Sequence, residues 1–169
     1  MSLETERLVL RAARLDDFEA IYHLRSDEKI NQYIKRSQIQ TREIVQSFLE
    51  RTILSVEKNE LFDWVICSKE NQKVIGSICL WNVSEDRSYA ELGYALRTDF
   101  HGKGIMNEAV SAVLKYGFTQ LFLDKIEAYT SRYNVKSIRM LERNGFQLLS
   151  NKRDDGNADN RIFELLRKV

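Results

Sequence analysis

Apolar positions recur at helical spacing in two stretches of the first third of the chain. The first stretch covers residues 16–25, with Asp16 or Asp17 at its start as a capping residue, and the second begins at Thr41. A short apolar run over residues 7–13 precedes both and is typical of a strand. The pattern therefore predicts a strand followed by two helices.

From residue 62 onward, runs rich in Val, Ile and aromatic residues alternate with helical patterns. Helices are predicted at about 105–118 and 134–145, and the second ends on Gly145, where a left-handed C-terminal cap favours glycine. The predicted strands are 62–68, 74–81, 89–97, 125–131, 146–151 and 161–168. The order β-α-α-β-β-β-α-β-α-β-β predicts an α+β fold with a mixed sheet flanked by helices.

Length, composition and charge favour one globular domain over residues 1–169. The 26 basic and 25 acidic residues nearly cancel, which argues against nucleic-acid binding driven by bulk charge. No apolar run reaches the ~18 residues of a membrane span, and the N-terminus lacks the apolar stretch of a signal peptide. Cys67 and Cys79 form no CxxC pair. We therefore expect a cytoplasmic protein with no metal site and no nucleic-acid or membrane partner.

The segment RTDFHGKGIMNEAV (97–110) places Gly102 and Gly104 around Lys103, directly before a predicted helix. A helix N-terminus presents unsatisfied amide N–H groups and partial positive charge, and glycine lets an anion approach the backbone closely. Lys103 adds a positive charge. The segment thus indicates phosphate binding, while a plain glycine turn opening a core helix remains the alternative.

Two common phosphate-binding motifs do not fit this loop. A Walker A loop needs Ser or Thr after its lysine, and here Gly104 follows Lys103. A dinucleotide GxGxxG motif has Asn107 in place of its third glycine, although Asp124 falls in the region of a ribose-binding acid. Three consecutive predicted strands before the loop also contradict the alternating strands and helices of a dinucleotide fold.

The stretch AELGYALRTDFHGKGIMNEAV (90–110) followed by NVKSIRMLERNGF (134–146) resembles the GNAT superfamily of N-acetyltransferases. Within it, the chain resembles the branch of the ribosomal-protein N-terminal (RimJ/RimL-type) acetyltransferases, from its opening ETERLVLRAARLDD onward. The resemblance implies acetyl-CoA as donor and an amine as acceptor. It also implies that two splayed parallel strands, here 89–97 and 125–131, hold the pantetheine arm.

The resemblance further implies that backbone amides of residues 101–107 hold the CoA pyrophosphate. Two positions depart from the broader pattern: His101 replaces Gln or Arg, and Met106 replaces a small residue. His101 either donates a hydrogen bond to CoA or is a solvated loop histidine. Asn134 is a good N-cap, to which the resemblance adds a contact with the pantetheine arm. The expected donor-binding residues are Leu96, Arg97, His101, Gly102, Lys103, Gly104, Ile105, Met106, Asn107, Asn134, Ser137 and Arg143.

Acetyl transfer to an amine needs a proton acceptor for the ammonium group and a proton donor for the leaving thiolate. Strand alternation places Glu91 on one face with Gly93 and Ala95, where small neighbours leave space, so Glu91 is the predicted general base. A Glu91 that faces solvent or pairs with an arginine is the alternative. Many family members donate the proton from a tyrosine at the position of Leu141, which leaves Ser137 as the candidate here. A thiolate that leaves unassisted also stays open, since thiols have a pKa of about 8.5.

The acceptor site is expected between residues 26–40 and the last hairpin at 151–160. Tyr33 could cover an acceptor, and acidic residues of the hairpin could attract an ammonium group or simply form a turn. These acidic residues are Asp154, Asp155 and Asp159. We expect an N-acetyltransferase acting on a ribosomal or other protein N-terminus or on a small amine. A non-catalytic acyl-CoA-binding or partner-binding relative is the alternative, and a homodimer is left open.

Overall fold

The structure is a computed structural model that describes residues 2–35 and 39–168. Its helices are α1 (Phe18–Ser26), α2 (Glu28–Asn31), α3 (Arg42–Glu57), α4 (Ile105–Thr119) and α5 (Val135–Arg143), with 3-10 turns η1 (Leu15–Asp17) and η2 (Thr98–Phe100). Its strands are β1 (Ser2–Glu4), β2 (Leu8–Arg11), β3 (Phe62–Ser68), β4 (Val74–Trp81), β5 (Tyr89–Leu96), β6 (Lys125–Ser131), β7 (Gln147–Leu148) and β8 (Asn160–Leu166). No helix in the described part of the chain is long and apolar enough to cross a membrane.

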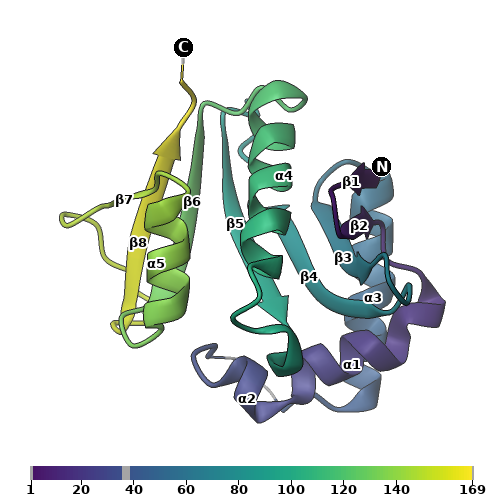
Figure 1. The fold of residues 1–169 in the computed structure, drawn as a ribbon. Helices are drawn as coiled ribbons and strands as arrows, with labels where there is room; N and C mark the ends of the chain where they lie inside the picture. The colour runs from purple at the N-terminus through teal and green to yellow at the C-terminus, as the bar shows by residue number, and fades with distance from the viewer. Residues whose placement is uncertain (1, 36–38, 169) are drawn as a thin grey trace.

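A twisted eight-stranded sheet passes through the middle of the molecule (Figure 1). The strand order is β1-β2-β3-β4-β5-β6-β8-β7, and only the β5–β6 pair is parallel among the described strands. This mixed sheet confirms the predicted α+β class. The predicted hairpin at 62–81 and the predicted parallel neighbours at 89–97 and 125–131 are confirmed as well.

Each face of the sheet is covered by its own helices. Along β3 the side chains alternate: Trp64 packs on the α4 side, where the ring of Tyr116 meets it edge-on at 5.5 Å. Val65 points to the opposite side and packs with Leu49 of α3. The period of two in the strand therefore distributes apolar residues to two separate cores, one under α4 and α5 and one under α1 and α3.

The parallel pair β5–β6 separates part-way along its length. Residues Tyr89–Leu92 pair with Lys125–Ala128, and no pairing continues beyond them. Parallel strands end at the same edge of a sheet, so β5 leads into α4 and β6 leads into α5 at one end of the molecule (Figure 1). The two sequence motifs meet at this end.

Of the helix caps predicted for the first two helices, one differs in the structure and one is confirmed. Asp17 does not cap α1 with its side chain. Its carboxylate instead accepts hydrogen bonds from the Arg11 guanidinium at 2.7 and 2.8 Å and from the Arg14 amide at 2.8 Å. Thr41 caps α3 as predicted, since its hydroxyl accepts from the Ile44 amide at 3.4 Å.

Two predicted strands are shorter in the structure, and two short elements appear that were not predicted. The predicted strand 7–13 shortens to β2, and β1 pairs with it as an extra edge strand. The segment 26–40 contains the short helix α2, and its residues 36–38 lie outside the described residues. The predicted strand 146–151 shortens to two residues, because the chain then turns away through a polar loop to Asn160.

Candidate active site

The glycine loop has the geometry of an anion-binding helix N-terminus. Gly102 and Gly104 adopt left-handed φ angles of 75° and 72°, which residues with a Cβ rarely adopt. A Cβ at Gly102 would project into open space. The amides of Gly102, Lys103 and Gly104 make no backbone hydrogen bond within the described chain. Together with the first amides of α4, they provide N–H groups that a pyrophosphate can accept from.

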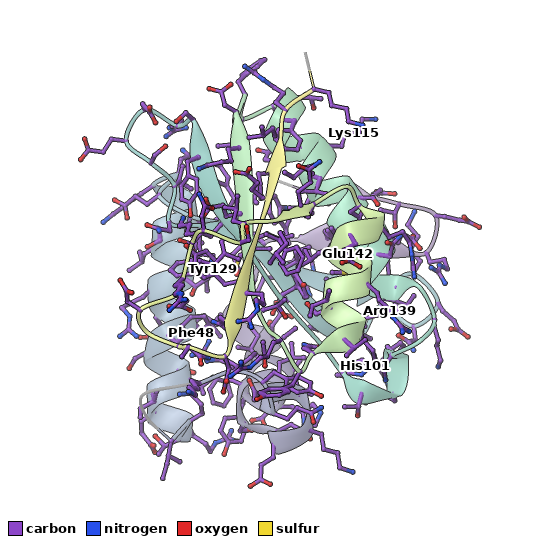
Figure 2. All side chains as sticks on the ribbon, turned by 90° about the vertical axis from the view of Figure 1, so that its left-hand side faces the viewer. Phe48, His101, Lys115, Tyr129, Arg139 and Glu142 are labelled. Carbon is purple, nitrogen blue, oxygen red and sulfur yellow. The ribbon has the colours of Figure 1, made fainter. Side chains whose placement is uncertain are left out.

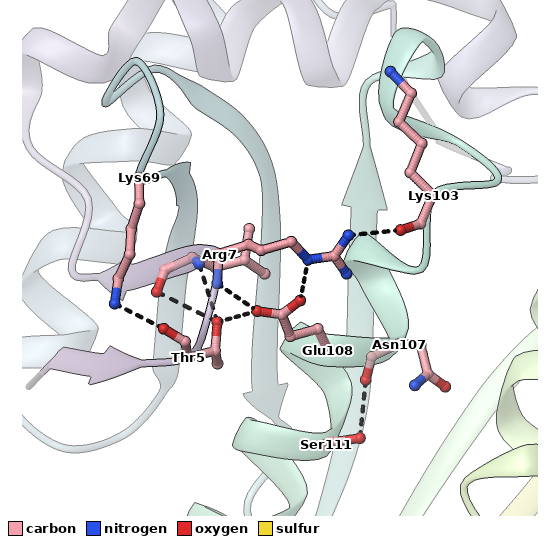
Figure 3. Close-up of polar contacts among 8 residues, drawn as sticks. Thr5, Arg7, Lys69, Lys103, Asn107, Glu108 and Ser111 are labelled. Atoms are coloured by element: carbon pink, nitrogen blue, oxygen red, sulfur yellow. Dashed lines mark hydrogen bonds and ion pairs between the residues drawn. The ribbon is translucent and has the colours of Figure 1, made fainter.

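The first residues of the chain hold this loop in place (Figure 3). The Arg7 guanidinium donates to the Lys103 carbonyl at 2.9 Å and to the Glu108 carboxylate at 2.7 Å. The hydroxyl of Thr5 donates to the same carboxylate. Burial acts to raise the pKa of Glu108, but the hydrogen bonds from Thr5 and Arg7 outweigh it, and the pKa is lowered. The loop is thus fixed by an ionised glutamate inside α4.

The polar side chains around the loop each contact a neighbouring residue of the chain. The His101 Nε2 atom lies 2.9 Å from the Leu96 carbonyl oxygen, so Nε2 carries the proton and donates. Arg97 forms an ion pair with Asp99 at 2.9 Å. The Lys103 ammonium lies 5.4 Å from the centre of the Phe100 ring. His101 lies at the N-terminal end of α4 and remains exposed (Figure 2).

Asn107 faces α5 rather than the loop opening. Its Oδ1 accepts a hydrogen bond from Asn144 Nδ2 at 2.9 Å and so joins α4 to the end of α5. Arg143 and Lys136 of α5 are exposed. Arg139 of the same helix is exposed as well (Figure 2). Ile105 is buried and Met106 half-buried in the first turn of α4. Among the predicted donor-binding residues, those of the loop and the first turn of α4 therefore lie together, whereas Arg143 is exposed to solvent.

The second motif places a hydroxyl between the separating strands. Asn134 caps α5 by accepting from the Ser137 amide at 3.2 Å. The Ser137 hydroxyl is buried, lies 2.6 Å from the Tyr94 hydroxyl, and accepts from the Thr130 hydroxyl at 2.9 Å. Leu141 is fully buried, so the position of the usual family tyrosine belongs to the core.

Glu91 lies on the opposite face of the sheet, inside a polar network. Its carboxylate accepts from Asn82 Nδ2 at 2.6 Å and from the Tyr89 hydroxyl at 3.1 Å, and only 8% of the residue is exposed. No arginine pairs with Glu91 among the described residues. The Glu91 carboxylate is thus fixed by two hydrogen bonds and largely excluded from solvent.

Glu127 is the residue of this network that the sequence pattern did not single out. It is fully buried, it stands opposite Glu91 in the β5–β6 register, and the Tyr89 hydroxyl lies 3.1 Å from its carboxylate. Ion pairs with Lys152 at 2.6 Å and Lys125 at 3.1 Å balance its charge. Burial acts to raise the pKa of Glu127, but these lysines and the tyrosine lower it overall. Only the parallel register brings the two glutamates together.

The acidic residues of the last hairpin serve mainly to shape it. Asp154 accepts from the Gly156 amide at 2.9 Å and from Asn160 Nδ2 at 2.7 Å. Asp159 forms an ion pair with Arg132, whereas Asp155 is exposed. Tyr33 is half-buried beyond α2. The turn interpretation therefore describes Asp154 and Asp159 better than a role in attracting an amine.

Two further features lie apart from this arrangement. A groove of about 460 Å³ runs between α4 and β8, lined by residues such as Leu114, Phe118 and Leu165, away from the N-terminal ends of α4 and α5. In the described ranges 2–35 and 39–168, no group of three or more His, Cys, Asp or Glu residues is arranged to hold a metal ion.

Comparisons with known proteins agree with this geometry. Residues 7–147 match the family model described as the acetyltransferase (GNAT) domain. The chain is 32% identical over 168 residues to the uncharacterized N-acetyltransferase p20 of Bacillus licheniformis, which covers 97% of this chain and 92% of that protein.

Solved structures share the fold. The ribosomal-protein-S5-alanine acetyltransferase of Vibrio fischeri superposes with a TM-score of 0.82 at 24% identity, covering 98% of this chain and 96% of that one. The spermidine N-acetyltransferase of Vibrio cholerae, solved with CoA and spermine, superposes with a TM-score of 0.82 at 21% identity over 96% of both chains. The predicted family is confirmed: the chain belongs to the GNAT acetyltransferases, a family that takes acetyl-CoA as donor.

Proposed function

We propose that this acetyltransferase, acting in the cytoplasm, transfers the acetyl group directly to a primary amine while donor and acceptor are bound together. The observation that supports this most strongly is the position of Glu91 and Ser137. They flank the point where β5 and β6 separate, and they do so from opposite faces of the sheet. A donor arm between the strands would thus have a carboxylate on its acceptor side and a hydroxyl on its thiol side.

The donor site of this proposal is built from backbone. The free amides of Gly102 and Lys103, with those of the first turn of α4, would donate hydrogen bonds to the pyrophosphate oxygens, and the open space at Gly102 leaves room for the pyrophosphate. The separated segments Gly93–Leu96 and Tyr129–Ser131 would accept the pantetheine arm between their unpaired backbone groups. His101, Asn134 and Ser137 stand along this path.

The proposed chemistry uses two side chains. Glu91 accepts a proton from the acceptor ammonium, directly or through water, and the free amine then forms the new C–N bond as the C–S bond breaks. Ser137 donates its hydroxyl proton to the leaving sulfur and is reprotonated by the proton that the acetylated nitrogen then releases. Glu91 is suited to the base role because Asn82 and Tyr89 hold its carboxylate in a fixed, largely solvent-excluded position.

We propose a protein N-terminus, ribosomal or other, or a small amine as acceptor. Two proteins that share this fold are named for one acceptor class each: the S5-alanine acetyltransferase for a ribosomal protein and the spermidine acetyltransferase for a small amine. A shared fold does not determine which acceptor is used, so the residues of the acceptor site decide between these classes. The helix α2 contacts β5, and Lys152 of the loop before β8 pairs with Glu127, which stands opposite Glu91. Both elements would contact the acceptor.

Thermal unfolding with acetyl-CoA, and with NAD and ATP as controls, tests the donor site. Donor at ~100 times its dissociation constant adds about 2.7 kcal/mol of stability, and each kcal/mol raises the Tm by about 2–4 °C at this chain length. A shift with NAD or ATP, and none with acetyl-CoA, would contradict the donor assignment.

An amine panel with Glu91→Gln tests the chemistry. Wild-type protein should release CoA in the presence of an amine, and the variant should bind acetyl-CoA normally but turn over at least tenfold more slowly across the pH range. Glu85→Gln, an exposed glutamate in the β4–β5 turn, is the matched control and should retain full activity. Donor binding without transfer to any amine would favour the non-catalytic alternative.

A further inference from the structure

The hydroxyl of Tyr89 lies between the carboxylates of Glu91 and Glu127 and has one proton to donate. Its oxygen is 3.1 Å from Glu91 Oε1 and 3.1 Å from Glu127 Oε2. Burial raises the pKa of Tyr89, and the two carboxylates raise it further, so the phenol keeps its proton. The hydroxyl can therefore donate to one of the two glutamates at a time.

Glu127 Oε2 already has two other donors. Lys152 Nζ donates to it at 2.6 Å, and the Tyr129 hydroxyl donates to it at 3.2 Å. A carboxylate oxygen has two lone pairs, so these two donors fill Oε2. A third hydrogen bond to this atom, from Tyr89, would find no free lone pair.

Glu91 has room for the Tyr89 proton. Within residues 2–35 and 39–168, Asn82 Nδ2 at 2.6 Å is the only other donor to Glu91 Oε1. Asn82 and Tyr89 together fill the two lone pairs of this oxygen. A hydrogen bond from a donor stabilises the ionised form of a carboxylate, which is the form that accepts a proton from an ammonium group. Donation from Tyr89 thus favours the form of Glu91 that the proposed chemistry needs.

Lys152 controls this balance from outside the strand pair. It lies in the loop before β8 with 42% of its side chain exposed, and it pairs with a Glu127 side chain that is 0% exposed. The other oxygen of Glu127, Oε1, is buried without a hydrogen-bond partner in the described chain, and the Lys125 ammonium faces it at 3.1 Å. Without Lys152, Glu127 would keep one ion pair, and Oε2 would regain a free lone pair. The Tyr89 proton would then be drawn from Glu91 to Glu127.

Other titratable and charged groups share this side of the sheet with Glu91. They come from β3, β4, β6 and β8 and are Asp63, Cys79, Lys125, Glu127, Tyr129 and Glu164. Lys125 is the one cation among these six groups. Lys152 therefore supplies one of the two ion-paired cations that the described residues place beside the two glutamates.

We propose that Lys152 is a positioning residue for the base: by occupying Glu127, it leaves the Tyr89 proton to Glu91. The inference rests on the proposed amine acetylation, in which Glu91 accepts the proton of the acceptor ammonium. Lys152 acts through Glu127 and Tyr89 rather than on the acceptor itself. The loop before β8 thus helps to activate the base.

NMR of isotopically labelled glutamate carboxyl carbons tests the proposal without turnover. The Glu91 signal is assigned by its absence in Glu91→Gln, and its titration is followed in each variant. In Lys152→Met the midpoint should rise by about one pH unit, because the ionised form loses its Tyr89 donor. Lys152→Arg keeps a cation and should restore most of the wild-type midpoint. Lys73→Met, at the exposed β3–β4 turn, is the control and should match wild type.

Tyr89→Phe separates an effect through Tyr89 from a direct effect of the Lys152 charge. It removes one hydroxyl and no charge, so it also keeps the test decisive if Lys152→Met does not fold. Tyr89→Phe alone should raise the Glu91 midpoint, and adding Lys152→Met should raise it little further. An unchanged midpoint in either single variant would overturn the proposal. So would a Lys152→Met shift of the same size with and without the Tyr89 hydroxyl.

Kinetics separate this proposal from the proposed function. For an amine that the wild-type protein acetylates, kcat/KM of Lys152→Met should fall about tenfold on the acidic limb of the pH profile and equal wild type on the plateau. A purely structural loss would lower both parts alike. The expected NMR shifts in a protein that acetylates no amine would support the network and contradict the proposed function. Loss of acetylation in Glu91→Gln with an unmoved Glu91 midpoint in Lys152→Met would do the reverse.

Discussion

The hydroxyl oxygen of Tyr94 lies 2.6 Å from that of Ser137, at the place where β5 and β6 have separated. Burial raises the pKa of Tyr94 to about 12, so this phenol keeps its proton at neutral pH. The Thr130 hydroxyl donates to Ser137 from the other strand. Either hydroxyl of the Tyr94–Ser137 pair can donate to the other. When Tyr94 donates, both lone pairs of Ser137 are occupied and the Ser137 proton is free to point toward a leaving sulfur.

Removing either hydroxyl of this pair should slow transfer without a comparable loss of donor affinity. Ser137→Ala removes the proposed proton donor, and we expect slower turnover with a donor dissociation constant changed by no more than the ~1 kcal/mol of one hydrogen bond. Tyr94→Phe removes only a hydrogen-bond partner of Ser137 and should reduce kcat less, by several-fold. Steady-state kinetics with isothermal titration of CoA measures both effects.

The control for this pair is Tyr116→Phe, which deletes a hydroxyl from a tyrosine packed on Trp64 in the core. It should leave kcat unchanged. If Ser137→Ala turns over acetyl-CoA at the wild-type rate, Ser137 is a structural residue and the thiolate leaves unassisted.

Gly102→Ala should weaken donor binding and also destabilise the protein. The φ angle of 75° is unfavourable for alanine by about 1–2 kcal/mol, and the new methyl group projects into the space assigned to the pyrophosphate. Gly156→Ala, at a turn glycine without a positive φ, is the control. Denaturant unfolding and CoA titration should show both losses for Gly102→Ala only. Normal CoA affinity in this variant would argue against phosphate contact at the loop.

Asp63→Asn should stabilise the protein at high pH. The pKa of Asp63 is raised to about 7 in the folded protein, so the folded state holds this proton more tightly than the unfolded chain does. Its contribution to stability is therefore greatest below the unfolded pKa of about 3.9 and is lost as pH rises to about 7.

We expect Asp63→Asn to gain about 1–3 kcal/mol over wild type at pH 8, allowing for partial exposure, and little at pH 4. Urea unfolding at the two pH values measures this difference. A gain that is the same at both values would contradict the raised pKa.

Lys152→Met should destabilise the protein near neutral pH by about 1–3 kcal/mol, because it removes one of two lysines from the fully buried Glu127. The pKa of Glu127 is lowered in the folded protein. Its stabilising contribution is thus present above the unfolded pKa of about 4.3 and is lost as pH falls through the folded value.

The difference between wild type and Lys152→Met should therefore shrink in acid. Unfolding curves at pH 7 and pH 3 test this, with Lys73→Met at the exposed β3–β4 turn as control. A deficit that persists unchanged at pH 3 would mean that Lys152 stabilises by packing alone.

Local chemistry made the glycine loop before α4 and two helix caps predictable from the sequence. The positive φ angles of Gly102 and Gly104, the Asn134 cap and the Thr41 cap all depend on residues within a few positions of each other. Asp17 shows where this reasoning fails. Its capping role was predicted from neighbours, but Arg11 on β2 offers a charged partner that outcompetes the helix amides.

The sequence by itself determined the order of elements, the glycine loop at the start of α4 and the face on which Glu91 lies, because these follow from periodicity and backbone preference. Only the tertiary structure decided that Tyr94 meets Ser137, that Glu127 stands beside Glu91, and that Lys152 pairs with Glu127. These relationships join strands and helices far apart in the chain. Their partners are set by strand register and packing, which no local pattern encodes.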